Sequence, residues 1–198
     1  MPRGGVGPAR RPDPTDHPAR RTRVWVVGGV VLVVTVVLLF AASQRFSRVL
    51  VVSASMSPTL EESSTAWLDR GADVEVGAVV VFEDPGGWAD AERALGVSVP
   101  SGDGPMLIAK RVLAVGGQTL TCCDESGRLD RDGRPVSEPY LAPGVSPSAL
   151  AFDVTVPEGY VWVMGDNRAH SLDSRQLYVG SGDGLVPVGN IVGRVVGR

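Results

Sequence analysis

Lysine is almost absent from this chain of 198 residues, which carries eighteen arginines and a single lysine, Lys110. A compositional bias toward arginine would leave that lysine at an arbitrary place. The alternative is chemical: an arginine guanidinium keeps its proton, whereas a desolvated lysine amine can lose its proton and act as a base. Both explanations stay open until the surroundings of Lys110 are considered.

Motifs for binding metals, nucleotides or nucleic acids are also missing. The chain has two histidines, no HExxH motif and no CxxC pair, which argues against the common zinc sites. It lacks a glycine-rich phosphate loop, and its net charge of −3 gives no basic footprint for nucleic acid. We therefore expect no metal, no cofactor and no nucleic-acid partner.

Only two cysteines are present, and they are neighbours, Cys122 and Cys123. An adjacent pair cannot link distant segments of the chain. The two thiols could close an eight-membered ring, pair with another chain or stay reduced. The sequence does not choose among these three states.

Charge is missing from one long stretch, residues 24–42. The stretch is long enough to cross a bilayer as a helix at about 1.5 Å per residue, so we predict a transmembrane helix. The alternative is a cleaved signal peptide, for which Ala41, Ala42 and Ser43 offer small residues. The run is longer than the roughly 7–15 apolar residues of a signal sequence, which favours the anchor.

Arginines cluster before this helix. Residues 1–23 carry six of them among proline, glycine and aspartate, which is typical of a disordered tail. They outnumber Arg45 and Arg48 after the helix, so we predict a cytoplasmic N-terminus and an extracytoplasmic domain over residues 43–198. The chain would then be a single-pass protein of the cell membrane.

Beyond the helix the pattern changes to short runs of branched and aromatic residues separated by glycine and proline, which are typical of strands. No segment after residue 50 shows sustained helical periodicity. We therefore predict a mostly β domain, with strands at residues 49–52, 79–82, 106–115, 154–156, 160–164 and 191–196.

Two polar regions are interpreted as loops. The Asp132-Gly133 pair predicts a hairpin turn, and we interpret Asp124, Asp130 and Asp132 as turn and solvent residues instead of calcium ligands. Residues 84–104, rich in proline, glycine and aspartate, are expected to form a flexible surface loop.

The strand that contains Lys110 is otherwise apolar. Alternation places its side chain on one face together with four apolar residues, Met106, Ile108, Val112 and Ala114. An ammonium among apolar neighbours loses hydration, which lowers its pKa. Its neutral amine is then a usable base near neutral pH.

The best candidate for a group that such a base would deprotonate lies at residues 53–60, and a second polar segment, residues 165–175, is of a kind that commonly closes a site. Residues 53–60 read Ser-Ala-Ser-Met-Ser-Pro-Thr-Leu, and residues 165–175 read Gly-Asp-Asn-Arg-Ala-His-Ser-Leu-Asp-Ser-Arg. Each follows a predicted strand, and either one alone is typical of a turn. Together with the lysine strand they indicate one assembled site.

These segments resemble the sequence boxes of bacterial type I signal peptidases, or leader peptidases, which are Ser/Lys serine peptidases. Residues 53–60 resemble the nucleophile box, usually written S-x-S-M-x-P-T-L. Residues 79–82, 109–111 and 165–175 resemble the remaining boxes, in the family's order and behind an N-terminal anchor. The resemblance covers nearly everything from about residue 24 onward and implies an extracytoplasmic domain of antiparallel β-sheets.

The resemblance implies roles for seven residues. Ser55 would be the nucleophile and Lys110 the general base that takes its proton. Ser53 would help the Ser55 backbone N–H to stabilise the oxyanion. The other four are Ser171, which would hydrogen-bond Lys110 and orient its amine; Asp173 and Arg175, which would support the site as an ion pair; and Met56, which would lie at the membrane surface where substrate binds. An arginine at position 110 would be unable to act as the base.

Some features depart from the family pattern or lie outside it. Residues 75–78 read Glu-Val-Gly-Ala where the family often has Arg-Gly-Asp, which changes a local turn. His170 lies beside Ser171, and relatives in the endoplasmic reticulum use a histidine base, but we interpret His170 as a solvent-facing or packing residue because Lys110 is present. Residues 117–155 would be a short, small β subdomain without a catalytic role.

The resemblance also implies the substrates. They would be secretory preproteins, cut after small residues at positions −1 and −3, whose chain pairs with exposed β-edges beside membrane lipid. A pilin-processing Ser/Lys peptidase is an alternative with the same chemistry. A membrane-tethered β domain that binds peptides without cutting them is an alternative from another class, and the intact Ser55, Lys110 and Ser171 argue against it.

Overall fold

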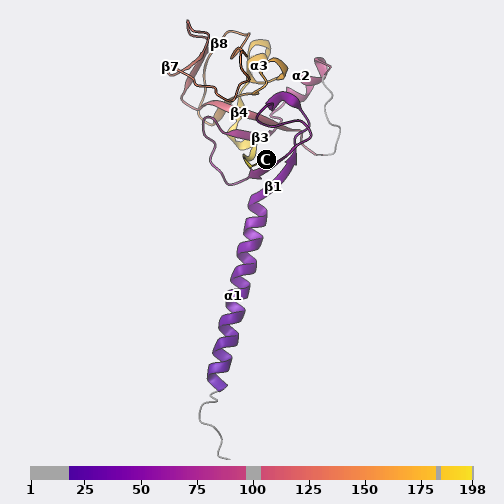
Figure 1. Ribbon diagram of the computed structural model, residues 1–198, viewed down its shortest axis with the longest axis vertical. Coiled ribbons are helices and arrows are strands. Elements are labelled where there is room, and N and C mark those ends of the chain that lie inside the picture. Colours follow the sequence, from indigo (N-terminus) through magenta and orange to yellow (C-terminus); the bar gives the residue numbers. More distant parts are fainter. Residues whose placement is uncertain (1–17, 97–103, 182–183, 198) are drawn as a thin grey trace, which may run out of the picture. The chain divides into compact units, whose positions relative to one another are not determined.

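The computed structural model describes residues 18–96, 104–181 and 184–197. The chain divides into two units, one ending at Gln44 and the other beginning at Arg45. The first unit contains a long helix, and the second contains the strands (Figure 1). The prediction of a mostly β domain behind an apolar helix is therefore confirmed.

Helix α1 (Pro18–Arg45) contains the apolar run. Its stretch Trp25–Arg45 is the one helix in the described part of the chain that is long and apolar enough to cross a membrane. The helix begins before the predicted residue 24, and a proline suits its first turn because the ring presets φ. Residues 1–17 of the predicted tail lie outside the described residues.

The larger sheet of the β domain has seven antiparallel strands in the order β1-β2-β11-β3-β4-β9-β10. Five predicted strands overlap observed strands of this sheet; they are residues 49–52, 79–82, 106–115, 160–164 and 191–196. The bounds are β1 Phe46–Leu50, β2 Thr65–Asp69, β3 Val79–Glu83, β4 Leu107–Val115, β9 Tyr160–Met164, β10 Val186–Pro187 and β11 Ile191–Gly197.

Strand β4 lies between β3 and β9, so its inward side chains are covered by the core. Ile108, Lys110 and Val112 are buried while the residues between them are partly exposed, which is the predicted alternation. A register shift between Val112 and Ala114 breaks the alternation, and Ala114 joins a different core cluster from Val112.

The second sheet has four antiparallel strands in the order β7-β6-β5-β8. The Asp132-Gly133 turn has positive φ at both residues and joins β6 to β7, so the predicted hairpin is confirmed. Apolar residues of this sheet pack in one cluster with Trp162 and Met164 of the larger sheet. The bounds are β5 Thr119–Cys122, β6 Leu129–Arg131, β7 Arg134–Pro135 and β8 Phe152–Thr155.

Cys122 and Cys123 form a disulfide with each other. Of the three states that the sequence left open, the structure has the eight-membered ring. Cys122 ends β5 and lies opposite Leu129 and Phe152 in the neighbouring strands. The ring belongs to the second sheet.

The short helices were not predicted. They are α2 (Trp88–Ala94) and α3 (Ser174–Ser181), with single 3-10 turns η1 (Ala54–Met56), η2 (Arg168–His170) and η3 (Val188–Asn190).

Helix α2 corrects the expectation that residues 84–104 form a flexible loop. Trp88 is 1% exposed, and its ring lies 5.1 Å from that of Phe82. Asp84 accepts hydrogen bonds from the first backbone N–H groups of α2. Residues 97–103 lie outside the described part.

Trp88→Ala should lower the free energy of unfolding by about 3–5 kcal/mol, because it removes a fully buried ring and leaves a cavity. Leu95→Ala, at a 67% exposed side chain just past α2, should change it by less than about 0.5 kcal/mol. Denaturant unfolding of the full chain in detergent, followed by circular dichroism, compares the two. Equal effects would mean that α2 does not belong to the core.

Candidate active site

Ser55 lies in η1, the single turn that follows β1. The turn begins at Ser53, whose Oγ accepts a hydrogen bond from the Ser55 backbone N–H at 3.1 Å. This is an N-cap contact, and it fixes the backbone beside the Ser55 side chain. Ser55 is 7% exposed, so its hydroxyl is held in the protein with little access to solvent.

Met56 anchors the same turn from the inside. Its side chain is 1% exposed and lies in an apolar cluster with Val51, Leu60, Ala66 and Val79. The expectation that Met56 lies at the membrane surface is therefore wrong in this structure, while its part in substrate binding stays a prediction. The physical reason is that a thioether next to a polar turn fills the core beneath that turn and fixes its position.

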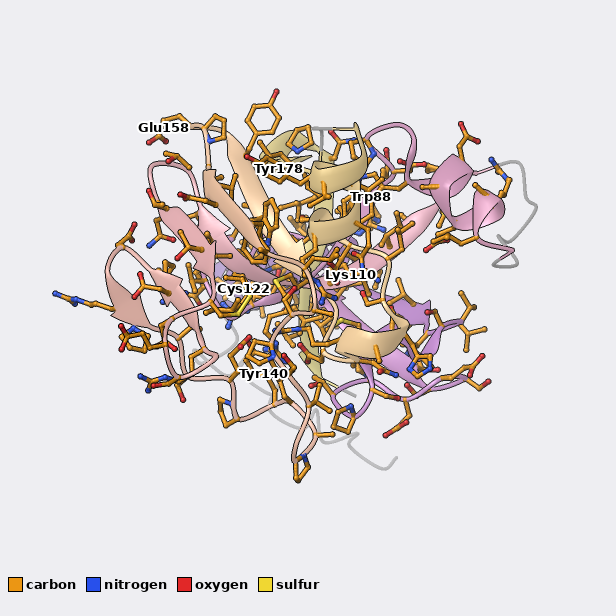
Figure 2. All side chains as sticks on the ribbon, turned by 90° about the horizontal axis from the view of Figure 1, so that it is seen from above. Trp88, Lys110, Cys122, Tyr140, Glu158 and Tyr178 are labelled. Atoms are coloured by element: carbon orange, nitrogen blue, oxygen red, sulfur yellow. A yellow bond between two sulfur atoms is a disulfide. The ribbon has the colours of Figure 1, made fainter. Side chains whose placement is uncertain are left out.

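Lys110 reaches Ser55 from β4. The Lys110 Nζ donates a hydrogen bond to Ser55 Oγ at 2.8 Å, although the two residues are 55 positions apart in sequence. Lys110 is 2% exposed and lies inside the β domain (Figure 2). The structure thus brings together the two side chains that the sequence analysis assigned to one site.

The environment of Lys110 lowers its pKa, and burial is the largest cause. The carboxylates of Asp173 and Glu92 act against burial and raise the pKa of Lys110. The guanidinium of Arg175 acts with burial and lowers it. Burial prevails because the ammonium gives up its hydration when the sheet covers it. The neutral amine is the form that can accept a proton from a serine hydroxyl.

Asp173 and Arg175 form a buried ion pair beside this site. Arg175 donates to both carboxylate oxygens of Asp173 at 2.8 Å, and neither side chain is more than 3% exposed. Asp173 also accepts the backbone N–H of Gly165 at 2.9 Å. The pair thus holds the strand end at Gly165 to the start of α3. The sequence analysis predicted an ion pair between these two residues, and its supporting role in the site stays a prediction.

Ser171 lies near Ser55, and its hydroxyl makes no hydrogen bond, although its carbonyl oxygen accepts one from the Gln176 side chain. It is 5% exposed, and its hydroxyl has no partner among the described residues. The predicted hydrogen bond from Ser171 to Lys110 is therefore absent, since the lysine amine is directed to Ser55. A Cβ built on Gly165 would lie 2.1 Å from Ser171 Oγ, so this hydroxyl packs against the bare backbone of Gly165.

Asn167 joins this loop to η1. Its backbone N–H donates to the Ser55 carbonyl oxygen at 3.0 Å, and its side-chain amide donates to the Ala54 carbonyl oxygen at 3.1 Å. The residues 165–175 and 53–60, which the sequence placed in one site, are thus bonded directly. Asn167 was not singled out from the sequence.

Arg111 and Asp166 are further residues that the sequence analysis missed. Arg111 donates to both carboxylate oxygens of Asp166, at 2.8 and 2.5 Å, and Thr59 Oγ1 donates to the same carboxylate at 2.5 Å. Only their positions in the sequence could have pointed to these two residues, because Arg111 directly follows Lys110 and Asp166 directly follows Gly165. The pair connects β4, the segment of residues 53–60 and the loop after β9.

His170 is exposed and lies within hydrogen-bond distance of the Asn167 side chain, at 3.2 Å. Its interpretation as a solvent-facing residue is confirmed. Within the described ranges, no group of three or more His, Cys, Asp or Glu side chains is placed to hold a metal ion. The site that the structure brings together is a buried serine hydroxyl in contact with a desolvated lysine amine, which is an arrangement for nucleophilic catalysis.

Comparisons with known proteins show the family to which this chain belongs. The sequence model of the family described as "Signal peptidase, peptidase S26" matches residues 23–198. Signal peptidase I of Mycobacterium tuberculosis is 34% identical over 91% of this chain and 74% of its own length. The probable signal peptidase I of Mycobacterium leprae is 31% identical over 90% of this chain and 76% of its own length. A crystal structure of a signal peptidase I from Enterococcus faecalis covers 63% of this chain and 98% of its own, with 22% identity and a TM-score of 0.44. The chain belongs to the signal peptidase family, peptidase S26.

Gly165→Ala should reduce the turnover number by about 10²-fold, because small displacements of reacting groups cost that much. The added methyl would lie 2.1 Å from Ser171 Oγ and 2.6 Å from the Ser55 carbonyl oxygen, so the nucleophile turn must move. The measurement is the rate of preprotein cleavage by the full chain in detergent.

Gly180→Ala is the matched control, because a Cβ at this helical position meets nothing within 4 Å. Its activity should equal that of the native chain, and its stability should rise by about 0.5–1 kcal/mol. Full activity of Gly165→Ala would show that the close packing around Ser55 is not required.

Proposed function

We propose that Ser55 and Lys110 are the catalytic dyad with which this signal peptidase removes signal peptides from secreted preproteins. As a member of its family the chain is a serine peptidase acting on signal peptides. The single observation that supports the dyad is the 2.8 Å contact between Lys110 Nζ and Ser55 Oγ, with both residues buried. Burial lowers the pKa of Lys110, which favours the neutral amine that the reaction needs.

The chemistry follows from that contact. Neutral Lys110 takes the Ser55 hydroxyl proton as Oγ attacks the scissile carbonyl carbon, which gives a tetrahedral intermediate. The Lys110 ammonium then protonates the departing amine, the carbon–nitrogen bond breaks, and an ester to Ser55 remains. Water, deprotonated by Lys110, attacks the carbonyl carbon of this ester. The carbon–Oγ bond then breaks, Ser55 Oγ takes the proton back from the Lys110 ammonium, and the signal peptide leaves with a new carboxyl terminus.

The oxyanion of the intermediate would be held by the Ser55 N–H and the Ser53 hydroxyl. In the free protein these two groups bond to each other at 3.1 Å, and Ser53 is exposed. Substrate would displace this contact: the N–H then points to the oxyanion, and the Ser53 hydroxyl turns to donate to it. The protein loses one internal hydrogen bond and gains two hydrogen bonds to the oxyanion. Because the negative charge on that oxygen develops in the transition state, the two donors stabilise the transition state more strongly than the bound substrate.

The surroundings of β1 suit a substrate that enters from a membrane. Phe46, Leu50 and Val52 are 42%, 63% and 55% exposed, and Trp67 of the neighbouring strand is 38% exposed. Exposed apolar residues of this kind lie at a membrane surface in our proposal. The topology proposed with it is a cytoplasmic N-terminus, a single span through α1 and an extracytoplasmic β domain, with preproteins cut after small residues at −1 and −3.

Cleavage of a preprotein with alanine at −1 and −3 by the full chain in detergent tests the dyad. Ser55→Ala and Lys110→Arg should each reduce the rate by about 10⁴-fold or more, because nucleophile and base act as a unit. Ser57→Ala is the matched control: Ser57 lies two positions from Ser55, and its hydroxyl bonds to Glu61 instead of Lys110. It should cleave like the native chain.

The same assay should show a falling kcat/KM as the pH drops through the lowered pKa of Lys110, because the protonated amine cannot accept the Ser55 proton. Cleavage that survives either dyad substitution in a folded chain would refute the assignment. A native chain that binds the preprotein without cutting it would support the peptide-binding alternative.

Ser53→Ala should reduce kcat by about 10²–10³-fold, since it removes one oxyanion donor. Ser53→Thr keeps a hydroxyl at the same place and should retain most of the activity. If Ser53→Ala and Ser53→Thr lose activity equally while both chains are folded, the hydroxyl has no part in holding the oxyanion.

A further inference from the structure

Glu138 is a buried acid with no part in the dyad. It lies between β7 and β8, in a segment without helix or strand, yet its side chain is only 6% exposed. A buried carboxylate is costly unless it is paired and hydrogen-bonded. The chain therefore keeps Glu138 inside by giving it specific partners.

Those partners are Arg168 and Tyr140. The Arg168 guanidinium donates to Glu138 Oε1 in an ion pair whose arginine side chain is 2% exposed. The Tyr140 hydroxyl donates to the same oxygen at 2.9 Å. Burial raises the pKa of Tyr140, so its hydroxyl keeps the proton that it donates.

Arg168 carries the influence of Glu138 to the active-site loop. Its guanidinium also donates to the Gly165 carbonyl oxygen at 3.0 Å and to the Pro147 carbonyl oxygen at 2.6 Å. Gly165 is the residue whose backbone packs against the Ser171 hydroxyl and whose N–H is held by Asp173. The Gly165 peptide is thus fixed on both sides, by Asp173 at its N–H and by Arg168 at its carbonyl.

Tyr140 reaches the other side of the same loop. The guanidinium of Arg111 lies over its ring, 4.0 Å from the ring centre, and Arg111 binds Asp166 through two hydrogen bonds. Arg111 also directly follows Lys110 in β4. The segment Glu138-Pro139-Tyr140 therefore contacts both arginines that hold residues 165 and 166 (Figure 2 labels Tyr140 and Lys110).

We propose that Glu138 and Tyr140 are positioning residues, which hold the loop around Gly165 and Asp166 so that the buried lysine base stays closed off from water. The proposal rests on the Ser55/Lys110 dyad proposed above. In the described part of the chain neither side chain hydrogen-bonds to Ser55 or Lys110, so both act through Arg168 and Arg111. This gives residues 117–155, for which the sequence suggested no catalytic role, an indirect part in the reaction.

Glu138→Gln tests this function with little change of shape, because glutamine keeps the oxygen that Tyr140 reaches but loses the charge that holds Arg168. We expect kcat to fall about 10²-fold with KM unchanged, since the residue touches no substrate. We also expect the acid limb of kcat/KM to move to higher pH, because a loosened loop admits water to the base. Tyr140→Phe, which keeps the ring under Arg111, should show the same changes to a smaller degree.

Ser137→Ala, at the exposed neighbouring position, is the control and should match the native chain in both quantities. A folded Glu138→Gln chain with the native kcat and the native acid limb would overturn the proposal. So would a variant that loses only stability, or one that fails to fold, because Glu138 would then serve the fold alone.

The failure of this proposal is separable from that of the dyad. If the native chain itself shows no acid limb, or if Ser55→Ala still cleaves, the dyad is wrong and the positioning role falls with it. If the native chain behaves as expected and only Glu138→Gln is indistinguishable from it, the dyad stands and the positioning role is refuted.

Discussion

The desolvation of one lysine is the constraint on which the rest of this structure depends. Burying Lys110 disfavours its ammonium form, and the surrounding charges must leave that effect in place. The Asp173 carboxylate acts against burial and raises the pKa of Lys110, because a nearby negative charge stabilises the ammonium. Arg175 binds both oxygens of that carboxylate and opposes it. The ion pair thus holds the loop in position while contributing little net charge at the base.

The sheet supplies the rigidity that such a site requires. Strand β4 carries Lys110 between β3 and β9, and the chain leaves β9 directly into the loop that begins at Gly165. That loop returns to the nucleophile turn through the two hydrogen bonds of Asn167. Each segment of the site is therefore an end or a neighbour of a packed strand, which limits how far the reacting atoms can separate.

Much of this could be predicted from residue types and their order. Strands appeared as runs of branched residues, and the lone lysine stood out because arginine cannot perform its chemistry. Helix α2 was missed because seven residues are too few to show a helical period. Met56 was misplaced because an apolar residue in a polar turn fits either a membrane or a core. The Glu138–Arg168 ion pair joins residues 30 apart, and isolated charges in polar segments look solvated until the fold buries them together.

The most direct test of the account uses the fact that Lys110 is the only lysine in the chain. Labelling lysine with ¹³C at Cε gives a single side-chain resonance from the full chain in detergent, and its titration reports the pKa of Lys110 alone. The account predicts a midpoint well below the ordinary lysine value of about 10.4. A midpoint at the ordinary value would show that the amine is protonated at neutral pH, and the Ser55/Lys110 mechanism would be contradicted.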